Sequence, residues 1–403
     1  MENIQQKGII TLIKSALTGI AYKLPDGFNI DNAAKYAAES QTVSIIYYGA
    51  LNCGIPEDLP SMELLFSQTC CAMALNEQQT YEYGKITAEF QKNQIEYMPL
   101  KGILLKEIYP KPDMRSMSDI DILIKPEQYG KIKVLFENMG YTEKSESNHE
   151  LPWRKNNIYI ELHKRIISTY NKDFYQYFGD GWELGKADEL QPYKYLMKPE
   201  DAFIYLFAHF AKHYRSGGIG IKHMTDLWVY IQAHPSLDNE YIEAQISELK
   251  LSEFYNNILL TLKAWFSDAD SNVITDFITN VIFESGSYGN WQNHISALMI
   301  REQKTTGHNN HTHTRQILKT VFLPYKHMCK KYPFLEKIPL LLPLMWIARG
   351  INVAFSAPAK IKRFYSDSKI MADENTDIYH QSLKFVGLDY NYGENDENTD
   401  NRR

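Results

Sequence analysis

Two aspartates one residue apart, Asp119 and Asp121, are the side chains of this sequence best suited to carry out chemistry. They lie in a predicted strand over residues 118–124, where successive side chains alternate between faces, so both carboxylates are expected to point the same way. Two neighbouring carboxylates repel each other. A divalent cation between them attracts both and offsets this repulsion. The spacing therefore indicates metal-assisted phosphoryl transfer.

A third acidic residue is expected on a neighbouring strand, because two aspartates alone would hold a metal weakly. Glu161 fits this role in a predicted strand over residues 157–164, on the polar face that it shares with His163. Three hard oxygen ligands, completed by phosphate oxygens and water, suit Mg²⁺. We expect His163 to make a structural hydrogen bond.

The Lys101-Gly102 pair ends a predicted strand over residues 95–100 and precedes a predicted helix. Glycine at this turn would let the backbone approach a phosphate, and the following helix would direct free N–H groups toward it. Lys101 and Arg115 could supply fixed positive charge to a triphosphate, although a solvated charge explains each equally well. Ser118 joins them as a candidate nucleotide contact.

His209 and His213 are four residues apart in a predicted helix over residues 201–213 and should share one face of it. The sequence lacks the HExxH order around them, so a metal site is not expected there. With Asp226 on the next helix, they are weak candidates for lining the acceptor side of a cleft.

Composition is that of an ordinary globular chain of 403 residues, with a formal net charge of −6. This balance gives no general attraction to phosphate polymers, so a long nucleic acid is not an expected partner. The four cysteines match neither a disulfide framework nor a zinc pattern, and Cys70 and Cys71 are expected to be buried in a helix.

The first residues lack the basic-then-apolar order of a signal peptide, and a cytoplasmic location is expected. The apolar stretch 338–348 contains two prolines and is too short to span a membrane, so a buried helix is favoured. Contact with a membrane surface through residues 338–363 is the less favoured alternative.

The periodicity predicts an α+β fold with a small mixed sheet between helical segments. We expect an N-terminal helical segment over residues 1–92, the α/β core over 93–197 and a C-terminal helical domain over 198–370. The acidic, Asn-rich tail 390–403 is expected to be disordered.

These motifs together resemble the minimal nucleotidyltransferase superfamily, to which polymerase beta belongs. More narrowly, the chain is similar to the family of uncharacterised nucleotidyltransferases over about residues 9–349. The positions that carry this likeness are Leu100–Leu105, Tyr109, Pro110, Arg115, Ser118–Ile124, Ile160–His163, Tyr332–Leu335, Pro343, Trp346 and Arg349. The resemblance implies that Asp119, Asp121 and Glu161 are the metal-binding carboxylates and that Gly102 is the glycine of the phosphate-binding turn. One departure is Ile103, which stands where the superfamily usually has Ser or Gly.

We therefore expect a Mg²⁺-dependent nucleotidyltransferase that moves a nucleoside monophosphate, with AMP favoured, from an NTP to a hydroxyl group and releases pyrophosphate. The acceptor would be a small molecule or a protein. The alternative is a catalytically inactive nucleotide-binding or interaction module, which could serve envelope or polysaccharide assembly.

Overall fold

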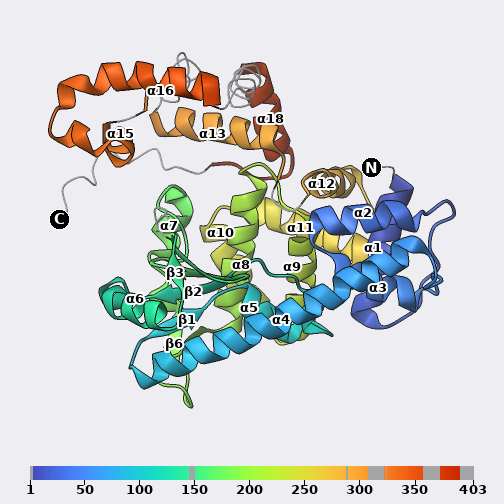
Figure 1. Ribbon diagram of the computed structural model, residues 1–403. Coiled ribbons are helices and arrows are strands. Elements are labelled where there is room, and N and C mark those ends of the chain that lie inside the picture. Colours follow the sequence, from blue (N-terminus) through green and yellow to red (C-terminus); the bar gives the residue numbers. More distant parts are fainter. Residues whose placement is uncertain are drawn as a thin grey trace. The chain divides into compact units, whose positions relative to one another are not determined.

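The computed structural model describes residues 3–144, 150–286, 289–306, 322–323, 325–356 and 373–390 (Figure 1). The chain forms two compact units. The first contains residues 1–214 and 219–289, and the second contains residues 215–218 and 290–403. The predicted boundaries at 92, 197 and 370 stay predictions.

The chain begins with helices, as the apolar periodicity of its first 92 residues predicts. Their bounds are Asn3–Thr18 (α1), Ile30–Ser40 (α2), Val43–Asn52 (α3) and Pro60–Lys92 (α4). The buried residues of α4 recur at intervals of three, four or seven positions, which makes one stripe along the helix. Cys70 and Cys71 fall outside this stripe and are exposed, so the prediction that they are buried is wrong.

A five-stranded mixed sheet forms the centre of the first unit. Its strands are Tyr97–Pro99 (β1), Ile120–Ile124 (β2), Thr142–Glu143 (β3), Glu150–Lys155 (β4) and Ile158–His163 (β5). Their order is β1-β2-β5-β4-β3, and only β2 and β5 pair in parallel. The predicted strand over residues 118–124 starts only at Ile120, which leaves Asp119 just before the sheet.

Strands β3 and β4 pair antiparallel and form a hairpin before β5. Residues 145–149 between them lie outside the described part of the chain.

One face of the sheet packs against α4 and α6 (Tyr129–Asn138), which lie beside it in Figure 1. Ile160 of β5, Phe90 of α4 and Phe136 of α6 belong to one hydrophobic cluster and are fully buried. Trp153 contacts Phe136 edge to face, with 5.3 Å between the ring centroids. This packing fixes the apolar face of β2 and β5, so their polar positions must point to the other side.

More helices complete the first unit. Their bounds are Gly102–Ile108 (α5), Lys172–Phe178 (α7), Pro199–Tyr214 (α8), Ile221–Ala233 (α9), Asn239–Glu248 (α10), Ser252–Phe266 (α11) and Val273–Glu284 (α12). Three 3-10 turns occur at Pro112–Met114, Pro126–Gln128 and Trp182–Leu184. A two-stranded antiparallel sheet pairs Gly185–Ala187 (β6) with Tyr195–Met197 (β7). Helix α9 contacts both α5 and α8, which places it next to the turn that precedes α5.

The second unit is helical where it is described. Its helices are Trp291–Thr306 (α13), Tyr325–Lys331 (α15), Leu342–Ser356 (α16) and Asp373–Phe385 (α18), with 3-10 turns at Pro333–Glu336 and Pro339–Leu341. Tyr390 is buried in this unit, and the rest of the tail predicted to be disordered, residues 391–403, lies outside the described residues.

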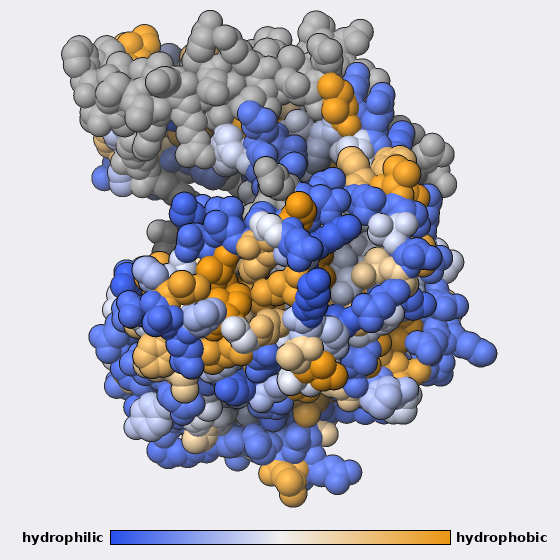
Figure 2. Space-filling view, turned by 90° about the vertical axis from the view of Figure 1, so that its right-hand side faces the viewer, coloured by the Kyte–Doolittle hydropathy of each residue, from blue (hydrophilic) through white to orange (hydrophobic). Residues whose placement is uncertain are grey.

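No helix in the described ranges is long and apolar enough to cross a membrane. The chain has an α+β fold, as predicted: a small mixed sheet embedded between helical segments. On the face seen in Figure 2, hydrophobic patches are set among hydrophilic residues.

Candidate active site

The parallel strands β2 and β5 bring two of the predicted metal-binding carboxylates together. Asp121 on β2 and Glu161 on β5 are direct register partners. Their sequence neighbours Ile120 and Ile160 are also paired and are fully buried on the opposite face. The alternation of apolar and acidic residues in each strand therefore fixes both carboxylates on the same polar face.

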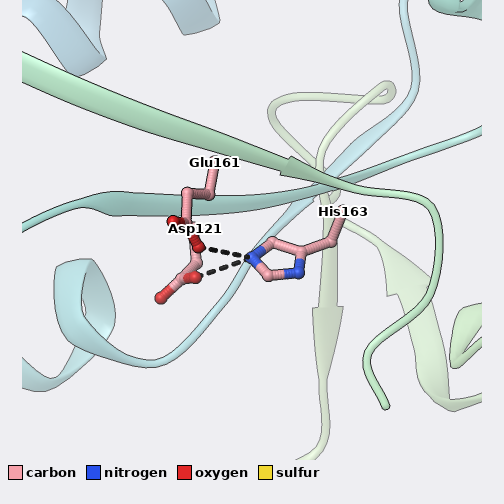
Figure 3. A group of neighbouring side chains, drawn as sticks. All are labelled: Asp121, Glu161 and His163. Atoms are coloured by element: carbon pink, nitrogen blue, oxygen red, sulfur yellow. Dashed lines mark hydrogen bonds and ion pairs between the residues drawn. The ribbon is translucent and has the colours of Figure 1, made fainter. Parts of the chain in front are cut away.

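His163 completes this group from the last position of β5 (Figure 3). Its Nε2 lies 2.7 Å from Oδ1 of Asp121 and 3.8 Å from Oε2 of Glu161. One ligand atom from each of the three residues lies within 4.8 Å of the others. The expected hydrogen bond of His163 is confirmed, and its partner is Asp121. The sequence did not predict that His163 would join the two carboxylates, although its position on the face of Glu161 was the available signal.

Asp119 stands beside this group on the segment before β2 and is partly buried. Ser118 is exposed, and its hydroxyl donates a hydrogen bond of 3.0 Å to Oδ1 of Asp119. Burial and the negative charge of Asp121 raise the pKa of Asp119. Asp119 is therefore close enough to sense the charge of Asp121, but it is not one of the three residues that share the 4.8 Å cluster.

The site concentrates negative charge that its own residues do not fully neutralise. Burial and the charges of Asp119 and Asp121 raise the pKa of Glu161 to about 8. Burial acts in the same direction on Asp121, but the nearby charge of Lys101 and the hydrogen bond from His163 outweigh it and hold that pKa well below its usual value. Two carboxylates that repel each other and a neighbouring imidazole form a donor set that fits a divalent cation.

Lys101 reaches the same aspartate from the turn before α5. Its Nζ lies 3.6 Å from Oδ1 of Asp121. Its backbone has φ 40° and ψ −109°, in the region of positive φ that non-glycine residues rarely adopt. The residue with the unusual backbone conformation in this turn is therefore Lys101 and not Gly102, which follows it.

Gly102 packs closely against the side chain of Met117. A Cβ atom at this position would lie 2.7 Å from Sδ of Met117 and 3.8 Å from Nη1 of Arg115. Met117 is buried beside the start of β2, so the glycine allows α5 to approach the strand that carries Asp121.

Arg115, a candidate phosphate contact, is buried and forms an ion pair with a residue of α9. Its Nε donates to Oδ1 of Asp226 at 2.7 Å, and the hydroxyl of Tyr109 donates to the same oxygen at 2.8 Å. Asp226 has no exposed surface, so the expectation that it faces an acceptor is wrong. Sequence reasoning did not find this pair, because no local pattern links two residues on such distant segments.

His209 and His213 share one face of α8, as predicted. Their Nε2 atoms are 3.1 Å apart, and the ring centroids are separated by 4.4 Å. His209 is buried, whereas His213 is exposed. Lys222 and His223 at the start of α9 also belong to this region, since His213 and Lys222 both act on the pKa of His223. Sequence reasoning did not single out either residue of α9.

One of the comparisons with known proteins, the match to a family model, agrees with the sequence motifs. No curated protein matches the chain. Among solved structures, the solution structure of the antibiotic-resistance factor ANT(2'')-Ia is similar at 13% identity and a TM-score of 0.32, over 48% of this chain and all of that one. The family model for uncharacterised nucleotidyltransferases matches residues 26–267, a span that contains β1 to β5, α8 and α9. The chain therefore belongs to the family of uncharacterised nucleotidyltransferases.

Proposed function

We propose that this protein is a Mg²⁺-dependent enzyme that transfers a nucleoside monophosphate, with AMP favoured, from an NTP to a hydroxyl group of a small molecule or a protein. Membership of a nucleotidyltransferase family supports the general reaction. The observation that carries the proposal is the register pair of Asp121 and Glu161, which holds two acidic side chains and His163 within 4.8 Å.

Asp119, Asp121 and Glu161 would hold the metal, and His163 would orient Asp121 through its 2.7 Å contact. Bound Mg²⁺ would supply positive charge to the phosphate oxygens of the transition state. Lys101, the Gly102 backbone and Ser118 would contact the phosphates. Arg115 would hold the turn in place through its ion pair with Asp226 and add positive charge behind it.

The reaction exchanges one bond for another. The acceptor oxygen forms a bond to the α-phosphorus as the bond between this phosphorus and the α,β-bridging oxygen breaks, and pyrophosphate leaves with that oxygen. The hydroxyl proton passes to the carboxylate of Glu161. Bound Mg²⁺ would lower the pKa that Asp119 and Asp121 raise in the metal-free protein, so Glu161 would be ionised and able to accept the proton.

Pyrophosphate release tests the proposal. The wild type should release pyrophosphate from an NTP in the presence of Mg²⁺ and a cell extract as acceptor source. The Asp119→Asn/Asp121→Asn variant should lose this activity while its thermal unfolding stays within a few degrees of the wild type. Glu137→Gln, which changes an exposed acidic residue on α6, is the matched control and should remain active. Unchanged release by the double variant would contradict the proposal.

A catalytically inactive nucleotide-binding module is the second candidate. Two observations favour it: Ile103 provides no hydroxyl group for a phosphate, and Lys101 already gives Asp121 a positive partner. Calorimetry separates the two candidates, since a module would bind an NTP with Mg²⁺ and release no pyrophosphate.

The remaining predictions from the sequence stay proposals. They are a cytoplasmic location, the absence of a long nucleic acid partner, and the division of the chain at residues 92, 197 and 370. A role in envelope or polysaccharide assembly at a membrane surface would require residues 338–363, of which 357–363 lie outside the described residues. Failure to co-sediment with anionic vesicles would remove that role.

A further inference from the structure

We propose that an apolar pocket between α5, β7, α8 and α9 binds the aromatic ring of a small, neutral acceptor, which carries the hydroxyl group that attacks the nucleotide. The inference rests on the proposed function and names the chemical class of its acceptor. All residues that line this acceptor pocket belong to the first compact unit.

The acceptor pocket has a volume of about 240 Å³. Helix α9 contacts α5 and α8, and α8 contacts β7, so these elements meet around one space. Most of the lining side chains are apolar, among them Leu100, Leu104, Ile108, Leu196, Met197 and Leu206. Leu100 and Leu206 are buried, whereas the other four are only half-buried, so the pocket is accessible from solvent.

The volume and the walls of the pocket suit a single ring. An apolar cavity of about 150 Å³ in a protein core is large enough to bind benzene. The acceptor pocket is larger and has room for one ring with a short substituent. Water finds few hydrogen-bond partners at apolar walls, so an apolar group that displaces it is bound favourably.

Aromatic side chains at the end of α9 favour an aromatic ligand. Tyr230 and His234 both line the pocket, and their rings stack with 4.2 Å between the centroids and 20° between the planes. Both are held in place, since the hydroxyl of Tyr230 donates to the carbonyl of Pro199 and Nδ1 of His234 donates to the carbonyl of Tyr230, each at 2.9 Å. Aromatic rings attract one another beyond the effect of the area that they bury, so an aromatic ring is favoured over an alkyl group of equal size.

The charged groups that line the pocket favour a neutral ligand. Besides His234, they are Lys101 and Glu107. Lys101 already has Asp121 as its negative partner, and Glu107 is exposed to solvent. A carboxylate on the ligand would be repelled by Glu107 and an ammonium group by Lys101, so an uncharged acceptor fits best.

Three of the lining residues connect the pocket to the segments that carry the carboxylates. The Nζ of Lys101 lies 3.6 Å from Oδ1 of Asp121, and the backbone N–H of Leu100 donates to the carbonyl of Asp121 at 3.0 Å. The hydroxyl of Tyr205 donates to the carbonyl of Ile166, just after β5, at 3.3 Å. A ring in the pocket is thus separated from Asp121 by one side chain, and a substituent on the ring could carry the hydroxyl group toward the metal-binding carboxylates.

Binding of benzyl alcohol to the full-length protein tests the inference without any NTP. Saturation-transfer NMR should show binding of its ring to the wild type. Ala202→Phe fills the pocket from a half-buried position that lines it, and should weaken this binding by about tenfold or more. Ala202→Leu is the smaller replacement if the phenylalanine variant does not fold. Ala74→Phe, the same substitution at an exposed position of α4, is the matched control and should bind benzyl alcohol as the wild type does.

Pyrophosphate release with Mg²⁺, ATP and a cell extract tests the role of the pocket in acceptor binding. Ala202→Phe should reduce release by about tenfold or more, because the acceptor loses its site, while its Kd for ATP with Mg²⁺ stays at the wild-type value. Ala74→Phe should release pyrophosphate at the wild-type rate. Wild-type release by a folded Ala202→Phe variant would overturn the inference.

The two measurements separate this inference from the proposed function. Benzyl alcohol binding that Ala202→Phe abolishes supports the pocket as a site for aromatic ligands even if the wild type releases no pyrophosphate, in which case the proposed function alone fails. A wild type that releases pyrophosphate and does not bind benzyl alcohol, or binds it equally well with Phe at position 202, overturns the inference and leaves the proposed function standing.

Discussion

Asp121 and Glu161 face each other across the parallel pair β2 and β5, although α6, β3 and β4 lie between them in the sequence. Their position depends on strand pairing and not on the conformation of a loop. The hydrophobic cluster behind both strands fixes the register, since a one-residue shift of either strand would turn its carboxylate into the core. The pairing of β2 with β5 therefore fixes the positions of these two acidic side chains.

Glu161→Gln should stabilise the metal-free protein at alkaline pH. The pKa of Glu161 is raised from 4.5 to about 8 in the folded state, so the folded protein keeps a proton that the unfolded chain loses. The contribution of Glu161 to the free energy of unfolding therefore falls as the pH rises from about 4.5 to about 8. Glutamine removes this penalty, and the Tm of the variant should exceed that of the wild type by about 2 °C above pH 8.

Thermal unfolding in the presence of a chelator measures this difference. The gain in Tm should shrink as the pH is lowered toward 4.5, where the glutamate is protonated in both states. A variant that is less stable than the wild type above pH 8 would show that the carboxylates do not repel one another.

Mg²⁺ should stabilise the wild type and not Asp121→Asn/Glu161→Gln. A ligand that binds only the folded state stabilises it by about 2.7 kcal/mol at a concentration one hundred times its Kd. The double variant removes two of the three residues of the 4.8 Å cluster and should lose most of this effect. Scanning calorimetry with and without Mg²⁺ gives the comparison, and an equal rise in Tm for both proteins would place the metal elsewhere.

Asp226→Ala should strongly destabilise the fold. It leaves the buried guanidinium of Arg115 without its 2.7 Å partner, and breaking a buried ion pair in this way costs about 3–5 kcal/mol. Tyr109→Phe removes only the neutral donor to the same oxygen and should cost about 1 kcal/mol. Urea denaturation measures both values. Equal losses for the two variants would mean that the ion pair contributes little.

Gly102→Ala should be destabilising, and a change at Met117 should rescue it. The added Cβ would lie 2.7 Å from Sδ of Met117, and overpacking of this kind costs about 1–3 kcal/mol. In the Gly102→Ala/Met117→Ala variant the two losses should not add, because the smaller side chain removes the clash. A double-mutant cycle by urea denaturation tests this coupling, and strictly additive losses would contradict the packing role of Gly102.

The sequence was most informative where local alternation decides the structure. Acidic and apolar residues alternate around Asp121 and Glu161, and this pattern is enough to predict strands with carboxylates on one face. The periodicity of the whole chain predicted the α+β class, and the family match confirms the resemblance to the uncharacterised nucleotidyltransferases. The buried residues of α4 were harder to predict from the sequence. Apolar residues occur around much of this helix, so the sequence does not show which side of it packs against other elements.

Tertiary contacts explain the rest of what the sequence did not reveal. The pair Arg115 and Asp226 forms because α9 packs on α5, and no spacing rule links residues so far apart in the chain. The positive φ of Lys101 is equally invisible in sequence, since glycine would be the expected residue at such a position. Lys222 and His223 carry no motif and become noticeable only beside the two histidines of α8.

A crystal structure with Mn²⁺ and a non-hydrolysable NTP analogue tests the central claim most directly. The account predicts an anomalous scattering peak bound by the carboxylates of Asp121 and Glu161, with the α-phosphate of the analogue next to it. A carboxylate pair without such a peak, with Lys101 still as the cationic partner of Asp121, would contradict the account.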